Sequence, residues 1–245
     1  KKKLITFIIM EEVGLRDKIK EVAKEFLKKA ENKKVQVISH FDTDGITSAV
    51  ILAKTLKKLD IEFSLKIVKS LERSFVENVS KDKTTIFLDL ASGIIEEIKK
   101  TGIKEIFIID HHEIPNKKIY KEIQIINPEI DGKEKASSSI LTYLFCKELT
   151  PKIKDMAKIA VIGMIGDRLE KEINLLNKEV LDDSKVKRKR GLLIYPSTRP
   201  INRTLEFSSS PYIPGVTGNP EGVAEILREA GIKPEGNKYK SIIEL

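Results

Sequence analysis

The chain has 245 residues, of which 40% are hydrophobic and 33% charged; this composition supports a sizeable core and excludes wholesale disorder. Its apolar runs fall short of the ~20 residues that a membrane span needs. The formal net charge of +8 favours an anionic partner, of which nucleic acid is the usual one. The single cysteine, Cys146, allows no intramolecular disulfide, which fits a reducing compartment such as the cytoplasm.

In chain order, the sequence predicts a short strand or an ordered leader at residues 4–9, followed by alternating helices and strands. Helices are expected at residues 14–30, 45–59, 71–79, 92–100, 137–149 and 151–166. Strands are expected at residues 35–39, 61–68, 85–88, 106–109 and 123–126. This alternation indicates an α/β fold, with a parallel sheet that carries helices on both faces.

The composition changes after residue 184. A basic run at residues 185–190 is followed by a segment rich in proline and glycine, and a helix is expected from about residue 222 to residue 230. We expect residues 1–184 to form the catalytic α/β domain and residues 185–245 to form a short, mainly helical extension packed on its core.

The side chains that carry chemistry stand at the carboxyl ends of the predicted strands. All three histidines of the chain, His40, His111 and His112, follow such strands, and Asp89 ends another. In parallel sheets, ligands bind beyond the carboxyl ends of the strands. We therefore expect one site that also contains three further aspartates: Asp42, Asp44 and Asp167.

Several carboxylates in one place require compensation. Two like charges ~4 Å apart repel each other by about 4 kcal/mol at an effective dielectric constant of 20. Divalent cations remove this conflict, and oxygen and imidazole ligands suit Mn²⁺ or Mg²⁺ better than zinc. Taken singly, Asp-x-Asp-Gly is usually a turn, and Asp44 or Asp89 is an ordinary helix N-cap. The joint placement favours a two-metal site that activates water for attack on a phosphodiester.

These residues resemble the motifs of the DHH superfamily of phosphoesterases, which includes RecJ exonucleases, small-oligonucleotide phosphodiesterases and family II pyrophosphatases. The four matching motifs are His40-x-Asp42-x-Asp44-Gly45, the strand end at Asp89, Asp110-His111-His112 and Gly166-Asp167. The chain is most similar to archaeal RecJ-like proteins, including the nuclease associated with the GINS replication complex. That likeness rests on Ser39–Gly45, on Thr198-Arg199-Pro200 and on Pro211–Gly218.

The resemblance implies a role for each matching residue. His40 and Asp42 would bind a first Mn²⁺ or Mg²⁺ ion, and Asp44, His111 and Asp167 would bind a second, with Asp89 bridging the two. His112 would donate a hydrogen bond to the scissile phosphate, and Asp110 would orient a histidine.

The residues expected to bind substrate are less specific. Ser137 and Ser138 open a predicted helix, where backbone N–H groups and hydroxyls can receive a phosphate; a plain serine N-cap explains them equally well. Arg199 and Arg203 are candidates for holding the nucleic-acid backbone, with a solvated surface as the alternative. The basic run at residues 187–190 is more typical of a solvated loop than of a DNA track.

The sequence contains no glycine-rich motif of the DHH-associated substrate-binding domain that RecJ-type enzymes carry. That domain is therefore expected to be absent from this sequence, with three explanations open: the sequence is truncated, a separate polypeptide supplies the domain, or the protein works without it. The favoured hypothesis is a metal-dependent exonuclease on single-stranded DNA or RNA, acting in DNA replication or repair. The alternatives are a replication scaffold that binds a GINS-type partner, and a phosphodiesterase for short oligonucleotides.

Overall fold

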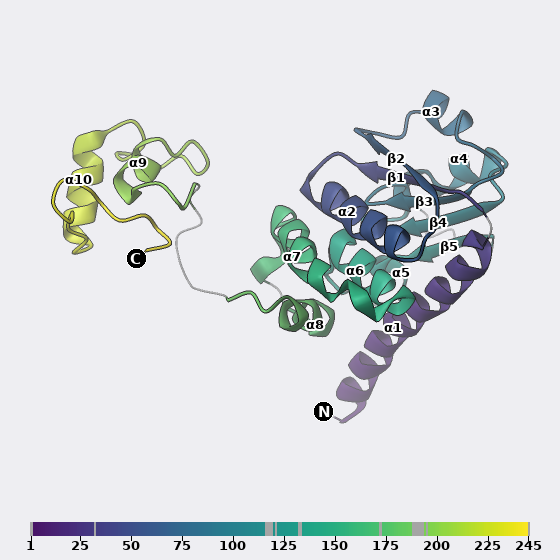
Figure 1. Cartoon of the computed structure of the whole chain (residues 1–245). Helices are drawn as coiled ribbons and strands as arrows, with labels where there is room; N and C mark the ends of the chain where they lie inside the picture. Colours follow the sequence, from purple (N-terminus) through teal and green to yellow (C-terminus); the bar gives the residue numbers. More distant parts are fainter. Residues whose placement is uncertain are drawn as a thin grey trace. The chain divides into compact units, whose positions relative to one another are not determined.

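The computed structural model separates into two units, Lys1–Val186 and Lys187–Leu245 (Figure 1). It describes residues 2–31, 33–115, 120, 122–131, 134–171, 173–187, 194 and 196–244, with side chains described from residue 14 onward. Within these residues, no helix has both the length and the apolar character to cross a membrane.

Five parallel strands form the sheet of the first unit, in the order β2-β1-β3-β4-β5 (Figure 1). The strands are β1 (Val35–His40), β2 (Phe63–Val68), β3 (Thr84–Leu88), β4 (Glu105–Ile109) and β5 (Ile123–Ile126). The register pairs Ser39 with Leu88, Leu88 with Ile109, and Ile109 with Ile126. The residues that come next on these four strands therefore stand in a single row at the carboxyl edge of the sheet.

Helices cover both faces of this sheet, which confirms the predicted α/β architecture (Figure 1). Successive strand residues point to opposite faces: Ile86 and Leu88 of β3 join one hydrophobic cluster and Phe87 joins the other. The first cluster includes residues of α1 (Lys2–Ala30), α2 (Thr43–Lys58), α6 (Ser138–Leu149), α7 (Ala157–Gly166) and α8 (Leu175–Ser184). The second includes residues of α3 (Arg73–Glu77) and α4 (Ile95–Lys100), with α5 (Pro128–Asp131) packed against it.

The structure departs from the predicted elements in several places, including helix α8, which was not expected. Residues 4–9 belong to α1, so the strand expected there is wrong; a short apolar run does not distinguish a strand from a helix. Strand β2 lies at the edge of the sheet and exposes its central residues, unlike the strands buried on both faces. Two of the predicted helices begin as 3-10 helices, Ser92–Ile94 and Pro151–Met156.

The second unit has its own small core. Helices α9 (Ile201–Glu206) and α10 (Pro220–Glu229) bury one cluster of apolar residues: Ile194, Ile201, Leu205, Val216, Val223 and Leu227. Helix α10 confirms the helix expected from about residue 222. Gly231 follows it with a φ of +72°, the left-handed conformation that glycine commonly adopts just after the end of a helix. The predicted packing of residues 185–245 on the catalytic core stays a prediction.

Candidate metal centre

The row at the carboxyl edge of the sheet consists almost entirely of polar residues. His40 ends β1, Asp89 follows β3, Asp110 follows β4 and Asn127 follows β5. The backbone ladder continues into this row, because the Asp89 N–H donates to the Ile109 carbonyl at 2.9 Å. The backbone of the sheet therefore sets the spacing of these side chains.

Around this row the structure brings together seven of the predicted site residues. Three groups of side chains place their ligand atoms within 4.8 Å of one another: His40, Asp42 and Asp89; Asp44, His111 and Asp167; and Asp89, His111 and His112. Asp89 and His111 each belong to two groups. The arrangement has the form expected of adjoining ion sites that share ligands.

The donor atoms fit a divalent cation. His40 Nδ1 lies 2.8 Å from Asp42 Oδ2 and 3.4 Å from Asp89 Oδ2, while His111 Nε2 lies 3.1 Å from Asp167 Oδ2. Yet His40 Nδ1, Asp89 Oδ2 and Asp167 Oδ2 are buried and complete no hydrogen bond of acceptable geometry. Buried polar atoms normally have a partner, and three such atoms, nitrogen and oxygen without thiolate, suit Mn²⁺ or Mg²⁺.

The start of helix α6 holds Asp44 in place. The Ser138 N–H donates to Asp44 Oδ2 at 2.6 Å, and the Ser139 N–H donates to Asp44 Oδ1 at 3.0 Å. The Ser138 hydroxyl donates to Asp89 Oδ1 at 3.0 Å. The N-terminal end of a helix favours negative charge, so α6 stabilises two carboxylates of the site at once.

This geometry differs from the expectation that Ser137 and Ser138 receive a phosphate of the substrate. Both serines are fully buried, and the amide of Ser138 is already taken by Asp44. Ser137 is the N-cap of α6 and accepts from the Ile140 N–H. The anion that the helix end receives is therefore a carboxylate of the protein.

Glycines let helices α2 and α7 approach closely beside Asp44. A Cβ at Gly163 would lie 2.6 Å from Asp44 Oδ1 and would also collide with Ser139 Oγ and Thr47 Oγ1. One turn further along, a Cβ at Gly166 would lie 2.7 Å from the Cβ of Thr43. Glycine at position 163 thus leaves room for the Asp44 carboxylate, and glycine at position 166 leaves room for Thr43 at the start of α2.

The carboxylates of the site repel one another, as the sequence predicts. Burial, together with the charges of Asp89 and Asp167, raises the pKa of Asp44 to about 7. Burial also raises the pKa of Asp89, against the opposing contact with His111. Burial alone would lower the pKa of His111, but contacts with Asp167 and Asp89 and the charge of Asp44 raise it to about 10. In the absence of a metal ion, a protonated His111 compensates part of the negative charge.

Asp110 and His112 form a tight turn at the edge of the site. Asp110 Oδ1 accepts from the His111 N–H at 2.8 Å and lies 2.7 Å from His112 Nδ1, while its Oδ2 accepts from the Ser92 N–H at 3.0 Å. Burial would raise the pKa of Asp110, but the contacts with His112 and Ser92 lower it to about 2. The His112 ring is half exposed, and its contact with Asp110 raises its pKa.

Two residues of this network were missed by the sequence analysis. The buried Asn127 side chain donates to Ser92 Oγ and to the His112 carbonyl, both at 2.9 Å. The signal for Asn127 was its place directly after the predicted strand at residues 123–126. Ser92 had no comparable signal, because its contact with Asp110 joins two separate strand ends.

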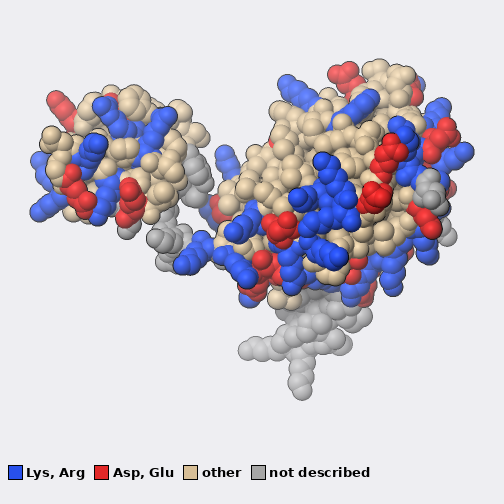
Figure 2. Space-filling view, in the orientation of Figure 1, with Lys and Arg blue, Asp and Glu red and all other residues tan. Residues whose placement is uncertain are grey.

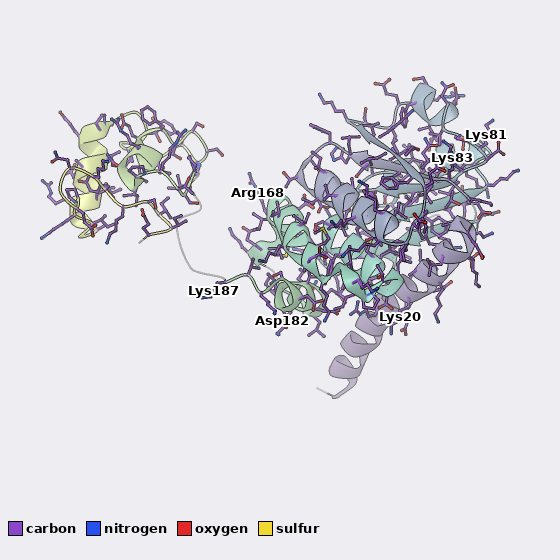
Figure 3. All side chains as sticks on the ribbon, in the orientation of Figure 1. Lys20, Lys81, Lys83, Arg168, Asp182 and Lys187 are labelled. Carbon is purple, nitrogen blue, oxygen red and sulfur yellow. The ribbon has the colours of Figure 1, made fainter. Side chains whose placement is uncertain are left out.

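Cations near the site and in the second unit are exposed. Arg168 directly follows Asp167 at the end of α7, whereas Lys81 and Lys83 precede β3 at the other end of the unit (Figure 3). In the second unit Arg199 is exposed, and Arg203 pairs with Glu206 at 2.9 Å. Of the predicted basic run, residues 188–190 lie outside the described residues.

Two family models match the chain. The model of the DHH family N-terminal domain matches residues 34–164, and the model of the DHH-CID domain matches residues 194–245. The first match contains His40, Asp42, Asp44, Asp89 and His111, and Asp167 follows just beyond its end. The second match falls within the second structural unit.

Proteins from archaea, bacteria and eukaryotes are similar to this chain. An uncharacterized protein of Methanocaldococcus jannaschii is 32% identical over 215 residues, which is 82% of this chain and 49% of the relative. The chain therefore spans about half the length of that curated relative.

Among solved structures, CDC45 from Entamoeba histolytica matches with a TM-score of 0.68 and 19% identity over 93% of this chain and 53% of that one. Exonuclease RecJ bound to manganese matches with a TM-score of 0.54 and 20% identity over 86% of this chain and 54% of that one. RecJ from Thermus thermophilus in complex with Mn²⁺ matches with a TM-score of 0.53 and 21% identity, over 86% of this chain and 31% of that one. At these identities the likeness shows the fold.

Proposed function

Because the chain belongs to the DHH family, we propose that it is a metal-dependent phosphoesterase whose substrate is single-stranded DNA or RNA. The observation that carries the proposal is the overlap of the three ligand groups, in which Asp89 and His111 are shared. One ion would need only one such group. Two adjoining ions are the arrangement that supports in-line displacement at a phosphodiester.

Each ligand has a proposed place. His40, Asp42 and Asp89 would hold one divalent ion, and Asp44, His111 and Asp167 would hold the other, with Asp89 reaching both. Mn²⁺ is favoured and Mg²⁺ is the second choice, because the donors are oxygen and imidazole. When bound, the ions would supply the Lewis acidity that activates a water and neutralises the phosphate.

The protein's own contribution beyond the ligands centres on His112. Asp110 contacts Nδ1 of the half-exposed ring, which leaves Nε2 as the ring nitrogen available to a substrate, and the raised pKa favours the protonated, donating form. We propose that His112 donates to a phosphoryl oxygen and that Asp110, kept ionised by its own lowered pKa, fixes the ring for that purpose.

The net charge of +8 agrees with an anionic substrate, yet it is not gathered in one visible patch. Figure 2 shows basic and acidic side chains interspersed over the face in view. Arg199 and Arg203 of the second unit remain proposed contacts for the strand backbone. We propose that this activity serves DNA replication or repair in the cytoplasm, with a GINS-type complex as partner.

The proposal is tested with end-labelled single-stranded DNA and RNA, the full chain and Mn²⁺. We expect release of mononucleotides from one end, and the choice of label shows both the sugar preference and the polarity. Asp89→Asn should lower the rate by at least about 100-fold, the upper range for disturbing the surroundings of a metal ligand. Asp82→Asn is the matched control, because Asp82 is exposed and lies before β3, at the opposite end of the strands.

Three outcomes separate the proposal from its alternatives. Hydrolysis of both short and long strands supports the exonuclease. Hydrolysis confined to oligonucleotides of a few residues favours a short-oligonucleotide phosphodiesterase. No turnover with Mn²⁺ or Mg²⁺, alongside tight binding to a GINS-type complex, contradicts the enzyme and favours a replication scaffold.

A further inference from the structure

An exposed aromatic ring stands inside the metal-binding motif. Phe41 lies between His40 and Asp42, and the residue is 49% exposed. Its ring meets the His40 ring edge to face, with centroids 5.0 Å apart and planes at 87°. A hydrophobic ring is thus held beside a proposed metal ligand while much of its surface faces solvent.

Local packing accounts for only part of this placement. Asp42 is the N-cap of α2, so Phe41 and Ile46 occupy the two positions that form a hydrophobic staple at a helix start. A staple needs an apolar side chain at each position, and an aliphatic one serves as well as an aromatic one. Ile46 is itself 45% exposed, so neither partner is buried by the other.

The chemistry of the surroundings indicates what the ring is for. Its neighbours in the site are carboxylates and imidazoles, which serve metal ions and phosphate. An inorganic phosphate gains nothing from an apolar ring. A nucleotide, in contrast, carries a flat base close to its phosphate. Any of the bases can stack on an aromatic side chain and so contribute to binding, whatever the sequence of the strand.

We propose that Phe41 is the stacking platform for the nucleobase next to the phosphate bound at the metal centre. This inference rests on the proposed phosphoesterase function and deepens it, because it makes a nucleobase a part of the substrate that the site recognises. The site would then select nucleotide phosphodiesters over phosphodiesters that lack a base.

The test compares two substrates of equal length and charge: an oligothymidine strand and a strand of the same length built from abasic tetrahydrofuran units. Phe41→Leu keeps an apolar side chain at the staple position and removes the π face, and Phe41→Tyr keeps both. We expect Phe41→Leu to lower kcat/KM on oligothymidine by about 5- to 150-fold and on the abasic strand by less than about 2-fold. Phe41→Tyr should resemble the wild type. Ile46→Ala, which trims the other half of the staple, should leave the ratio between the two substrates unchanged.

Binding gives a second measurement that does not depend on turnover. With Ca²⁺ in place of Mn²⁺, a strand containing 2-aminopurine should lose fluorescence on binding to the wild type through stacking, and should lose much less on binding to Phe41→Leu.

Equal losses on both substrates in Phe41→Leu would overturn the inference, since they would mean that the ring only positions His40. Unchanged kinetics on both, or equal quenching in both proteins, would overturn it as well. If the wild type hydrolyses neither strand, the proposed function fails, and the quenching experiment alone then decides whether Phe41 stacks on a base.

Discussion

Replacing Gly163 by alanine tests how the close approach of α2 and α7 supports the metal centre. The new Cβ would collide with the side chains of Ser139, Thr47 and Asp44, all of which are buried. Inserting a methyl group into a packed interior destabilises by about 1–3 kcal/mol, and these three neighbours, held by hydrogen bonds, favour the upper end. The better helix propensity of alanine returns about 1 kcal/mol. The expected net loss in the free energy of unfolding is about 2 kcal/mol.

The same substitution should weaken metal binding, because Asp44 has to move to make room. If the binding of Mn²⁺ becomes weaker by the same amount, about 2 kcal/mol, its Kd rises about 30-fold. Urea unfolding without metal measures the first effect, and calorimetric titration with Mn²⁺ measures the second. Gly93→Ala is the control, because a Cβ there meets nothing within 4 Å. A Gly163→Ala protein with wild-type stability and wild-type Mn²⁺ affinity would refute the reasoning.

Three further predictions concern the charges around and away from the site. Asp89→Asn should stabilise the metal-free protein, because it removes a buried charge from a cluster of repelling carboxylates and asparagine tolerates the φ of +59° at this position. The substitution should also abolish the increase of about 2.7 kcal/mol in the free energy of unfolding that Mn²⁺ gives at 100 times its Kd, as measured by thermal unfolding. Ser138→Ala removes the hydroxyl that donates to Asp89 and should lower the free energy of unfolding by about 1.5–3 kcal/mol; an unchanged urea midpoint would show that this hydrogen bond contributes nothing. Partial burial raises the pKa of Glu179, but contacts with Arg16 and then Lys147 lower it. Burial likewise raises the pKa of Asp183, but contacts with Lys147 and Tyr143 lower it. The stability from these pairs is therefore present above the ordinary pKa values of 4.5 and 3.8 and is lost as the pH falls through the lowered ones. Lys147→Met should therefore lower stability at neutral pH and flatten its decline towards acid, and parallel pH curves for variant and wild type would contradict this.

Part of the proposed ligand set could be located from the sequence because His40, Asp89 and His111 stand at or just after the ends of strands with a strong apolar pattern, whereas Asp167 follows a helix. The positions of Asp89 and His111 needed only the rule that parallel strands end at one edge. The partners of Asp44 could not be found in this way, because Ser138 lies 94 residues away and its role depends on how α6 packs on α2. A serine at a helix start has the same local pattern whether it receives a phosphate or a carboxylate.

The remaining differences have similar causes. Helix α8 was not predicted, and its buried residues Leu176 and Val180 form a short apolar stripe in a polar segment. The apolar residues before Glu11 carry no periodicity that separates a strand from a helix. In α8 the packing of these residues on the core, rather than the local pattern, decides the conformation.

The single row formed by His40, Asp89, Asp110 and Asn127 makes the centre a reporter of how the chain assembles. A slip of one residue in any of these strands would move its side chain by about 3.3 Å and turn it to the other face of the sheet. High-affinity metal binding during refolding should therefore arise only after β1, β3 and β4 have paired in the native alignment. A metal-sensitive signal recorded during refolding would therefore measure when these strands pair, a step in folding that is otherwise difficult to observe.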